Sequence, residues 1–381
     1  MFKIFSLSCI AAIFTLLSFT TEPINKVQLG EKLFFDPILS KDSTISCASC
    51  HNPTLAFADS LAISPGLSGK SGRRNAPSVM NMAARSEFFY DGRAKSLRDQ
   101  VHFPIEDPME MDLPMEIAVQ RIKNNRTYQL LFKKIYFEAP NEKNISDAIA
   151  SFEESLETAN TEFDAWMMDK PNTMSPSAIR GRELFMSDKA KCFDCHFSPD
   201  FTGDEFKNIG LYDEIKYKDK GRYEVTGNKN DIGKFKVPGL RNVAITGPYM
   251  HDGSFKTIEE VIEYYDNPYT FVKTPINMDT LLLKPIHFTP EEKIISSQIA
   301  PNNIYAFAIT RKLVPIQHIL KENENGPIIE VRDNLIFVNL ITKEKKEFDL
   351  YNLASKEIID LSKTIPVPVQ FTFHADLLSW S

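Results

Sequence analysis

Apolar residues recur every three to four positions in several stretches of the chain, and this spacing predicts short amphipathic helices. Ser146 is the expected N-cap of the helix over 146–159, and Glu153 and Glu154 are expected on its solvated face. Ser175 or Ser177 is expected to cap another. The stretches are LGEKLFF (29–35), PMEIAVQRIKNN (114–125), TYQLLFKKIYF (127–137), SDAIASFEESLETA (146–159) and SPSAIRGRELF (175–185).

The pattern changes after about residue 320. The stretch GPIIEVRDNLIFVNLITKEKKEF (326–348) has β-branched runs on both sides of RDN, which predicts a hairpin that turns at RDN. IPVPVQFTF (365–373) is expected to be a further extended segment. The sequence gives no functional reading for this tail.

The N-terminus, MFKIFSLSCIAAIFTLLSFTTEP, has Lys3 before a nearly continuous apolar run from Ile4 to Phe19. This is typical of a secretory signal peptide, and the run is shorter than the ~20 apolar residues that a membrane-spanning helix needs. We therefore expect export to the periplasm, with residues 1–21 as the signal peptide. Cleavage, retention and lipid attachment at Cys9 all stay open.

The length of 381 residues suits two domains and an appendage. MDKPNTMSPS (168–177) has the composition of a linker. The net charge of −7 argues against a nucleic-acid partner, which would favour a basic surface.

Four cysteines remain besides Cys9, and they form two C-x-x-C pairs. In an exported protein such pairs are disulfides, metal ligands or haem tethers. A histidine directly follows each pair, in CASCH (47–51) and CFDCH (192–196). This is the pattern of c-type haem attachment, in which two thiols bond to the porphyrin and the histidine binds the iron.

The alternatives explain the adjacent histidines less well. A zinc site needs four ligands and has no need of a histidine beside the second cysteine. A thioredoxin-like pair needs a βαβ context, which is absent. We therefore expect two haem c groups. Haem 1 is tethered by Cys47 and Cys50 with His51 as iron ligand, and haem 2 by Cys192 and Cys195 with His196.

The segments before the two motifs are similar. Gly-x-x-Leu-Phe occurs in both, beginning at Gly30 and at Gly181, and a short helix pattern and a loop lead to the motif in each case. This repetition indicates a duplicated helical, haem-binding unit.

With the two motifs 145 residues apart, from Cys47 to Cys192, the chain resembles the bacterial diheme cytochrome c peroxidases and the MauG-like enzymes over roughly residues 25–315. The resemblance implies a mainly α fold, with two cytochrome-c-like haem domains (22–165 and 166–320) and a small C-terminal β-containing extension (321–381). The motifs that support it are GRRNAPSVMN (72–81), FFYDGRAKSLRDQ (88–100), PMEM (108–111) and KVPGLRNVAITGPYMHDGSFKTIEEVIEYY (236–265).

The resemblance also implies an activity. Haem 1 would react with hydrogen peroxide, and haem 2 would take electrons from a small cytochrome c or cupredoxin. Gln100 and Glu110 match the distal residues of the reactive haem. A carboxylate there can move a proton between the peroxide oxygens, and an amide can orient the peroxide.

Three positions depart from the peroxidase pattern. The loop DSLAISPGLSGKSGRRNAPS (59–78) lacks the histidine that occupies the resting iron in many relatives, so haem 1 is expected to be open or water-bound. Tyr265, fourteen residues after His251, replaces the usual methionine ligand of haem 2, as in MauG-like enzymes; Met250 and Met278 remain rival ligands. Tyr90 replaces the tryptophan between the haems, where it either relays electrons or only packs.

His102 lies near the distal residues, but a helix would point it away from Gln100. The resemblance also implies a bound Ca²⁺, with ligands from the Asn75 side chain and the carbonyls of Thr246 and Pro248. Oxygen donors of this kind suit calcium.

The expected function is a periplasmic diheme peroxidase. The alternative is a MauG-like oxidase that acts on a protein or organic substrate through a high-valent diheme state. A third reading is an electron carrier or sensor without turnover. The resemblance leaves a homodimer open.

Overall fold

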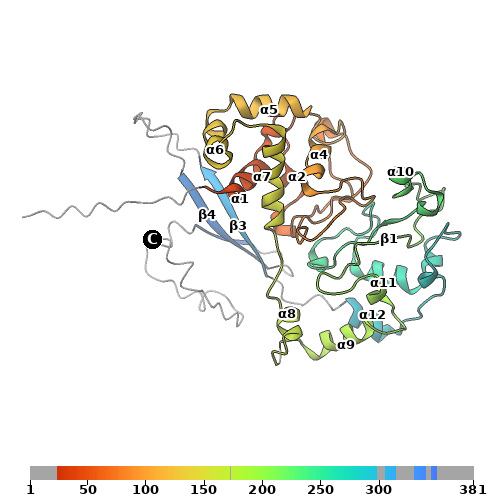
Figure 1. Cartoon of the computed structure of the whole chain (residues 1–381). Helices are drawn as coiled ribbons and strands as arrows, with labels where there is room; N and C mark the ends of the chain where they lie inside the picture. Colours follow the sequence, from red (N-terminus) through yellow and green to blue (C-terminus); the bar gives the residue numbers. More distant parts are fainter. Residues whose placement is uncertain (1–23, 172, 298–304, 315–329, 340–344, 350–381) are drawn as a thin grey trace, which may run out of the picture.

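The structure is a computed structural model that describes residues 24–171, 173–297, 305–314, 330–339 and 345–349 (Figure 1). The predicted signal peptide, Cys9, the IPVPVQFTF segment and the boundary at 320/321 lie outside these residues. The helices of the first lobe, residues 24–161, are α1 (Lys26–Phe35), α2 (Cys47–Cys50), α3 (Leu97–Gln100), α4 (His102–Glu106), α5 (Met115–Asn124), α6 (Arg126–Tyr136) and α7 (Glu142–Glu154). Those of the second lobe, residues 162–297, are α8 (Glu162–Met167), α9 (Pro176–Phe185), α10 (Tyr223–Thr226), α11 (Ile258–Asp266) and α12 (Pro290–Ser297).

The predicted helices at 29–35, 114–125, 127–137 and 175–185 correspond to α1, α5, α6 and α9. Their ends follow local chemistry. Asn25 caps α1 by accepting a hydrogen bond from the Gln28 amide, and Ser175 caps α9 by accepting one from the Ala178 amide. The choice between the two serines at α9 is therefore settled in favour of Ser175.

The prediction for α7 was wrong at both ends. The helix begins at Glu142, five residues earlier than an N-cap at Ser146 would give, because Asn141 provides the N-cap, and it ends at Glu154 rather than at residue 159. Ser146 lies inside the helix and is buried, and Glu153 is also buried. Glu153 lies four residues after Ile149, so it belongs to the apolar face that packs inward.

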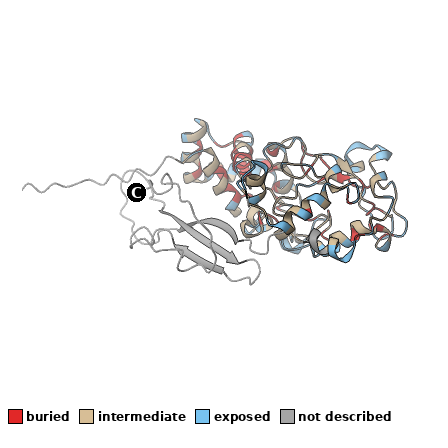
Figure 2. Cartoon of the chain, turned by 90° about the horizontal axis from the view of Figure 1, so that it is seen from below, coloured by how far each residue is buried: buried red, intermediate tan, exposed pale blue. Residues whose placement is uncertain are grey.

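The first lobe has its core between α1, α5, α6 and α7. Helices α1 and α7 cross closely at Gly30, where a Cβ atom would lie 1.8 Å from the Ala148 carbonyl oxygen. Cys47 packs against the edge of this core, so the first C-x-x-C-H motif rests on it. Figure 2 shows many buried positions in these helices.

The second lobe repeats this plan with a smaller core. The helix before its motif, α9, packs against α12, as α1 packs against α7. A separate apolar cluster gathers around Leu211, Phe255 and Tyr264. The predicted domain boundary at 165/166 falls inside α8, and the division into domains stays a prediction.

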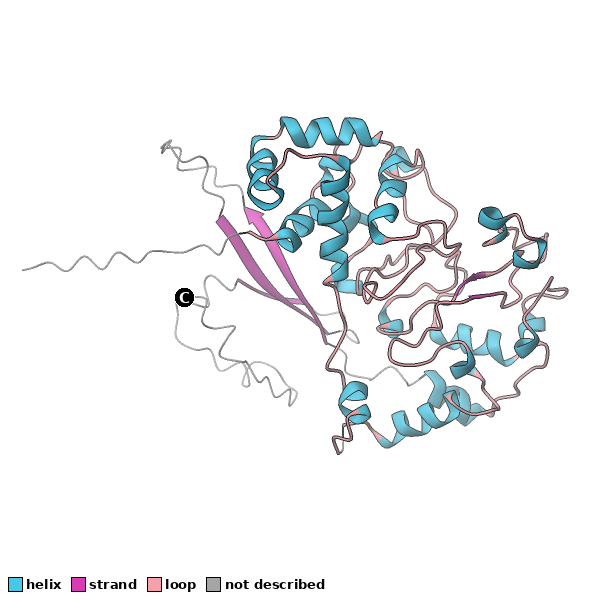
Figure 3. Ribbon diagram, viewed as in Figure 1, coloured by secondary structure: helices cyan, strands magenta, loops and turns pink. Residues whose placement is uncertain are grey.

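Long loops fill much of the space between the two lobes (Figure 3). Among them is a two-stranded antiparallel ribbon of β1 (Phe206–Lys207) and β2 (Phe235–Lys236).

A three-stranded antiparallel sheet follows the second lobe in the sequence, in the order β3–β4–β5. The strands are Tyr305–Val314, Glu330–Asn339 and Lys345–Asp349. The predicted turn at RDN was wrong, because β4 runs through it and Asp333 pairs with Arg311 of β3. Val331 before RDN and residues 335–339 after it therefore belong to one strand. Among the described residues, no helix is long and apolar enough to cross a membrane.

Candidate haem sites and their surroundings

The first C-x-x-C-H motif forms one short helix, α2, and His51 follows it directly. The Nδ1 atom of His51 lies 3.1 Å from the Phe57 carbonyl oxygen, to which it can donate a hydrogen bond. This bond fixes the tautomer in which Nε2 is free to bind a metal. Burial lowers the pKa of His51, which favours the neutral imidazole that an iron ligand requires.

The second motif has the same construction. Cys192–Asp194 form a 3₁₀ turn, and Nδ1 of His196 lies 2.8 Å from the Phe201 carbonyl oxygen. Burial also lowers the pKa of His196. All four cysteines are free thiols rather than disulfides. Each motif thus offers two thiols and one oriented neutral imidazole, a set that fits haem c.

Glu110 lies beside the first motif. Its carboxylate is close enough to Cys47 and Cys50 to raise the pKa values of both thiols. Burial, with a smaller effect from Asp107, raises the pKa of Glu110 itself, and Arg93 opposes the rise. No hydrogen bond engages the Glu110 carboxylate within the described part of the chain, so it is available to a ligand.

A loop packs directly on the backbone of Glu110. The Leu67 amide donates to the Glu110 carbonyl oxygen at 2.9 Å, and Lys70 Nζ donates to the Pro108 carbonyl oxygen at 3.2 Å. A Cβ atom on Gly66 would lie 1.8 Å from the Met109 carbonyl oxygen. The loop that lacks the resting histidine therefore helps to fix the position of Glu110.

Gln100 ends α3 and is partly buried. No hydrogen bond within the described ranges engages its side-chain amide, and none joins it to Glu110. His102 turns toward α7 instead, with Nε2 at 3.0 Å from Ser146 Oγ and Nδ1 at 3.4 Å from Glu142 Oε1. The expectation that His102 points away from Gln100 agrees with these contacts.

Tyr265 of α11 lies beside the second motif. Burial raises the pKa of its phenol, and the Cys192 and Cys195 thiols add to the rise. The structure therefore brings Tyr265 to the second haem-attachment site, as ligation of haem 2 requires. Of the two rival ligands, Met278 packs its sulfur on Gly210, and Met250 lies at the edge of the same apolar cluster as Tyr265.

Tyr90 lies where the two lobes meet. Its carbonyl oxygen accepts a hydrogen bond from the Lys236 amide of β2 at 2.7 Å. Burial raises the pKa of the Tyr90 phenol, with Asp252 of the second lobe adding to the rise. This location agrees with an aromatic residue between two haems, and its part in electron transfer stays a prediction.

The three predicted calcium ligands lie in neighbouring segments. Asn75 is buried; its backbone amide donates to the His251 carbonyl oxygen at 2.8 Å, and its Nδ2 donates to the Leu61 carbonyl oxygen at 3.0 Å. Across the described residues, no hydrogen bond uses Asn75 Oδ1 or the carbonyl oxygens of Thr246 and Pro248. Three neutral oxygen donors are therefore available, a set that suits calcium.

Two features were missed from the sequence. One is a set of ion pairs between the lobes, whose partners are far apart in the chain. In these pairs Arg74 binds Asp219, Arg85 binds Asp200 and Asp204, and Arg222 binds Glu87. The other is buried Glu153, which its four-residue spacing from Ile149 could have revealed.

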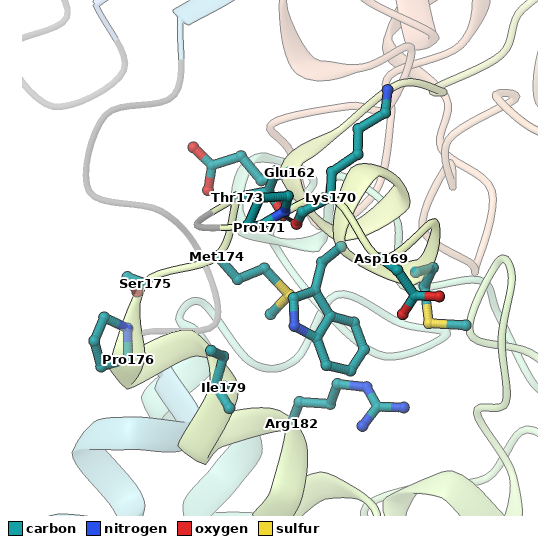
Figure 4. Close-up of a pocket in the computed structure, with 12 residues that line it drawn as sticks. Glu162, Asp169, Lys170, Pro171, Thr173, Met174, Ser175, Pro176, Ile179 and Arg182 are labelled. Atoms are coloured by element: carbon teal, nitrogen blue, oxygen red, sulfur yellow. Dashed lines mark hydrogen bonds between the residues drawn. The ribbon is translucent and has the colours of Figure 1, made fainter.

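An open groove of about 960 Å³ lies between α8 and α9 (Figure 4). Trp166 and Met174 help to line it, and the guanidinium of Arg182 lies 4.5 Å from the centre of the Trp166 ring. None of the residues that line this groove is a candidate haem-site residue.

Two attachment motifs of this construction define a c-type haem protein with two haem sites. A family model for di-haem cytochrome c peroxidase matches residues 24–172. Cytochrome c551 peroxidase of Nitrosomonas europaea is 38% identical over 247 residues, covering 64% of this chain and 73% of that protein. The methylamine utilization protein MauG of Methylorubrum extorquens is 37% identical over 244 residues, covering 63% and 68%.

Among solved structures, a MauG-like protein associated with microbial copper homeostasis is similar at a TM-score of 0.66 and 30% identity, covering 72% of this chain and 87% of that one. The chain belongs to the di-haem cytochrome c peroxidase and MauG family. Membership implies two covalently bound haem c groups and a peroxidase-type oxidoreductase. The relatives include both peroxidases and MauG proteins, so they do not separate these two activities.

Proposed function

We propose that this protein reduces hydrogen peroxide to water with electrons from a small cytochrome c or cupredoxin. The observation that supports this most directly is Glu110, a partly buried carboxyl beside the first haem-attachment motif. An electron carrier has no need of such a group. A peroxidase needs one, because the oxygen–oxygen bond breaks heterolytically only when a proton moves between the two oxygens.

Haem 1, when bound by His51, supplies the iron at which peroxide is cleaved. Glu110 accepts a proton from one peroxide oxygen and delivers it to the other, which then leaves as water. Gln100 orients the peroxide through hydrogen bonds from its amide. The raised pKa of Glu110 brings it closer to neutral pH than that of a solvated glutamate, which favours proton transfer in both directions.

Electrons enter at the second motif in this proposal. His196 and Tyr265 would hold the iron of haem 2, and Tyr90, which lies where the two lobes meet, would provide the route to haem 1. A tyrosine ligand stabilises ferric iron more than a methionine would, which lowers the potential of haem 2. Oxidation of Tyr90 would also release its phenolic proton, so its use as a relay would couple electron transfer to proton movement.

In the fully oxidised enzyme, haem 1 would already be able to bind peroxide. The loop 59–78 contains no histidine, and it contacts the backbone of Pro108 and Glu110, the segment that carries the proposed acid–base residue. We therefore propose that haem 1 is open or water-bound when both irons are ferric, so that no reductive activation is needed.

A MauG-like oxidase is the second candidate. Tyr265 supports it, since tyrosine at this position is typical of MauG-like enzymes and the Cys192 and Cys195 thiols are close enough to act on its phenol. In that case the oxidising equivalents would be used on a protein or organic substrate.

Steady-state turnover with peroxide and a reduced small cytochrome distinguishes these candidates. We expect rapid oxidation of the donor, and a loss of about 10²–10⁴-fold in Glu110→Gln, the usual contribution of general acid–base catalysis. Glu116→Gln, at an exposed position of α5, is the control and should retain full turnover. Consumption of peroxide without oxidation of the donor would favour the MauG-like alternative.

Three further proposals accompany this function. The N-terminal segment supports a periplasmic location, which fractionation of expressing cells tests. The oxygens of Asn75, Thr246 and Pro248 support one bound Ca²⁺, which metal analysis of the purified protein tests. A homodimer is also proposed, and sedimentation of the haem-loaded protein tests it.

A further inference from the structure

Glu153 is a buried carboxyl that the proposed chemistry does not use. Its side chain is 4% exposed, and its Oε2 atom has no hydrogen-bond partner in the part of the chain that the structure describes. Buried polar groups are usually paired, because leaving one unpaired costs about 1–3 kcal/mol. An orphaned carboxyl inside a core therefore calls for an explanation.

The surroundings of Glu153 disfavour a negative charge. It lies in the last turn of α7, where the helix dipole is negative, and Glu154 follows it directly. The nearby cation Arg98 is engaged elsewhere, with Asp147 and with Glu154 at 3.0 Å. Burial and the charge of Glu154 together raise the pKa of Glu153 to about 8. This carboxyl therefore binds a proton near neutral pH.

Glu153 is also close to the reactive haem site. Burial raises the pKa of the Cys47 thiol most, and the charge of Glu153 raises it next most. Glu110 acts on the same thiol more weakly. Cys47 becomes a neutral thioether once haem is attached. Glu153 and Glu110 are then the carboxyls that act on this tether, and Asp59 and Glu110 act on the second tether, Cys50.

We propose that Glu153 is the proton-binding group coupled to reduction of haem 1. This rests on the assignment of haem 1 to Cys47, Cys50 and His51. When one electron is added to haem 1, the positive charge near Cys47 falls by one unit. The Glu153 carboxylate then binds one proton from solvent, which restores the local charge. Because reduction and proton uptake favour each other, the potential of haem 1 falls as the pH rises.

The test is the midpoint potential of haem 1, measured in the haem-loaded full-length protein by spectroelectrochemistry at a series of pH values. We expect the wild-type potential to fall with pH within about one unit of pH 8. In Glu153→Gln this fall should be lost. Tyr265→Phe should change the midpoint potential of haem 2 alone, which identifies the reduction step that belongs to haem 2.

Glu154→Gln is the matched control, since this neighbouring carboxylate is paired with Arg98. It should retain the pH dependence, moved to lower pH because the charge of Glu154 helps to raise the pKa of Glu153. Glu110→Gln should also retain the pH dependence of the haem 1 potential. If Glu153→Gln fails to incorporate haem, Glu153→Asp decides the question, because a shorter carboxyl should keep the dependence at a shifted pH. A wild-type potential that is constant between pH 7 and about 9, or a dependence that persists in Glu153→Gln, would overturn the proposal. The potential can be measured whether or not peroxide is turned over, so this outcome is separate from that of the peroxidase assay.

Discussion

The proximal histidines are fixed in the same way at both motifs. The Nδ1 atom of each ring can donate a hydrogen bond to a backbone carbonyl oxygen a few residues later. The acceptor is Phe57 for His51 and Phe201 for His196. The bond leaves Nε2 for iron and increases the basicity of the ligand. The two sites therefore differ in the side chain that another segment brings close to the motif cysteines. This is Glu110 at the first site and Tyr265 at the second.

Ligation by Tyr265 predicts a spectral change on mutation. In Tyr265→Phe, haem 2 loses its phenolate ligand, so its ferric absorption and magnetic resonance signals should change while those of haem 1 remain. Tyr269→Phe removes a hydroxyl that donates to the Leu283 carbonyl oxygen, and its spectra should match the wild type. An unchanged haem 2 spectrum in Tyr265→Phe would refute ligation.

Single residues show what the sequence could and could not predict. The identity of the tethering cysteines and of their histidines follows from five adjacent letters, because covalent attachment requires that spacing. The burial of Glu153 was missed because glutamate is usually solvated. Its four-residue spacing from Ile149 nevertheless puts it on the apolar face of α7, which packs inward.

The contact between α1 and α7 is the most extensive helix packing among the described residues of the first lobe, and it predicts a cost at Gly30. In Gly30→Ala the new methyl would lie 1.8 Å from the Ala148 carbonyl oxygen, so the helices must separate. We expect a loss of about 1–3 kcal/mol in the free energy of unfolding, typical of overpacking, although alanine is the better helix former. Denaturant unfolding of the haem-loaded protein measures it.

Gly72→Ala is the matched control for this substitution. Gly72 is exposed and has no atom within 4 Å of an added Cβ, so its replacement should change stability by no more than about 0.5 kcal/mol. Equal effects at the two glycines would contradict the packing account.

At the scale of elements, periodicity predicted the helices well and the strands less well. The helix patterns at 114–125 and 127–137 correspond closely to α5 and α6, because apolar positions at helical spacing have few other uses. The hairpin at RDN failed because charged residues occur within strands as well as in turns. Asp333 lies opposite Arg311 in the sheet, and only the pairing partner reveals that.

Across the whole molecule, the lobes are joined by partly buried ion pairs, among them the pair of Arg74 and Asp219. Arg74 Nε and Nη2 donate to the two Asp219 oxygens at 2.7 and 2.8 Å, and Asp91 also binds Arg74. Burial alone would raise the pKa of Asp219, but the hydrogen bonds and charge of Arg74 outweigh it and hold the value at about 2.

This pairing predicts a pH-dependent stability. Because the folded pKa of Asp219 is depressed, its contribution is present above about pH 4 and is lost as the pH falls toward about 2. Asp219→Asn should therefore cost about 2 kcal/mol at pH 7, and the difference from wild type should shrink below pH 4. Asp188→Asn, at an exposed position, is the control for chemical unfolding. A cost that stays the same from pH 7 to about pH 3 would contradict this account.

The contacts between the two lobes could not be predicted from the sequence. Arg74 and Asp219 are separated by 145 positions, and nothing in either local segment identifies the other as its partner. The repeated Gly-x-x-Leu-Phe segment did predict that the lobes share a plan, because both use a helix before the motif in the same way.

Electron paramagnetic resonance of the fully ferric protein tests the central claim most directly. With no histidine in the loop 59–78 and Tyr265 at the second site, the account predicts two distinct signals. One comes from an open or water-bound haem 1, which changes on addition of peroxide, and the other comes from a tyrosine-ligated haem 2. Two low-spin haems with strong sixth ligands, unchanged by peroxide, would contradict it.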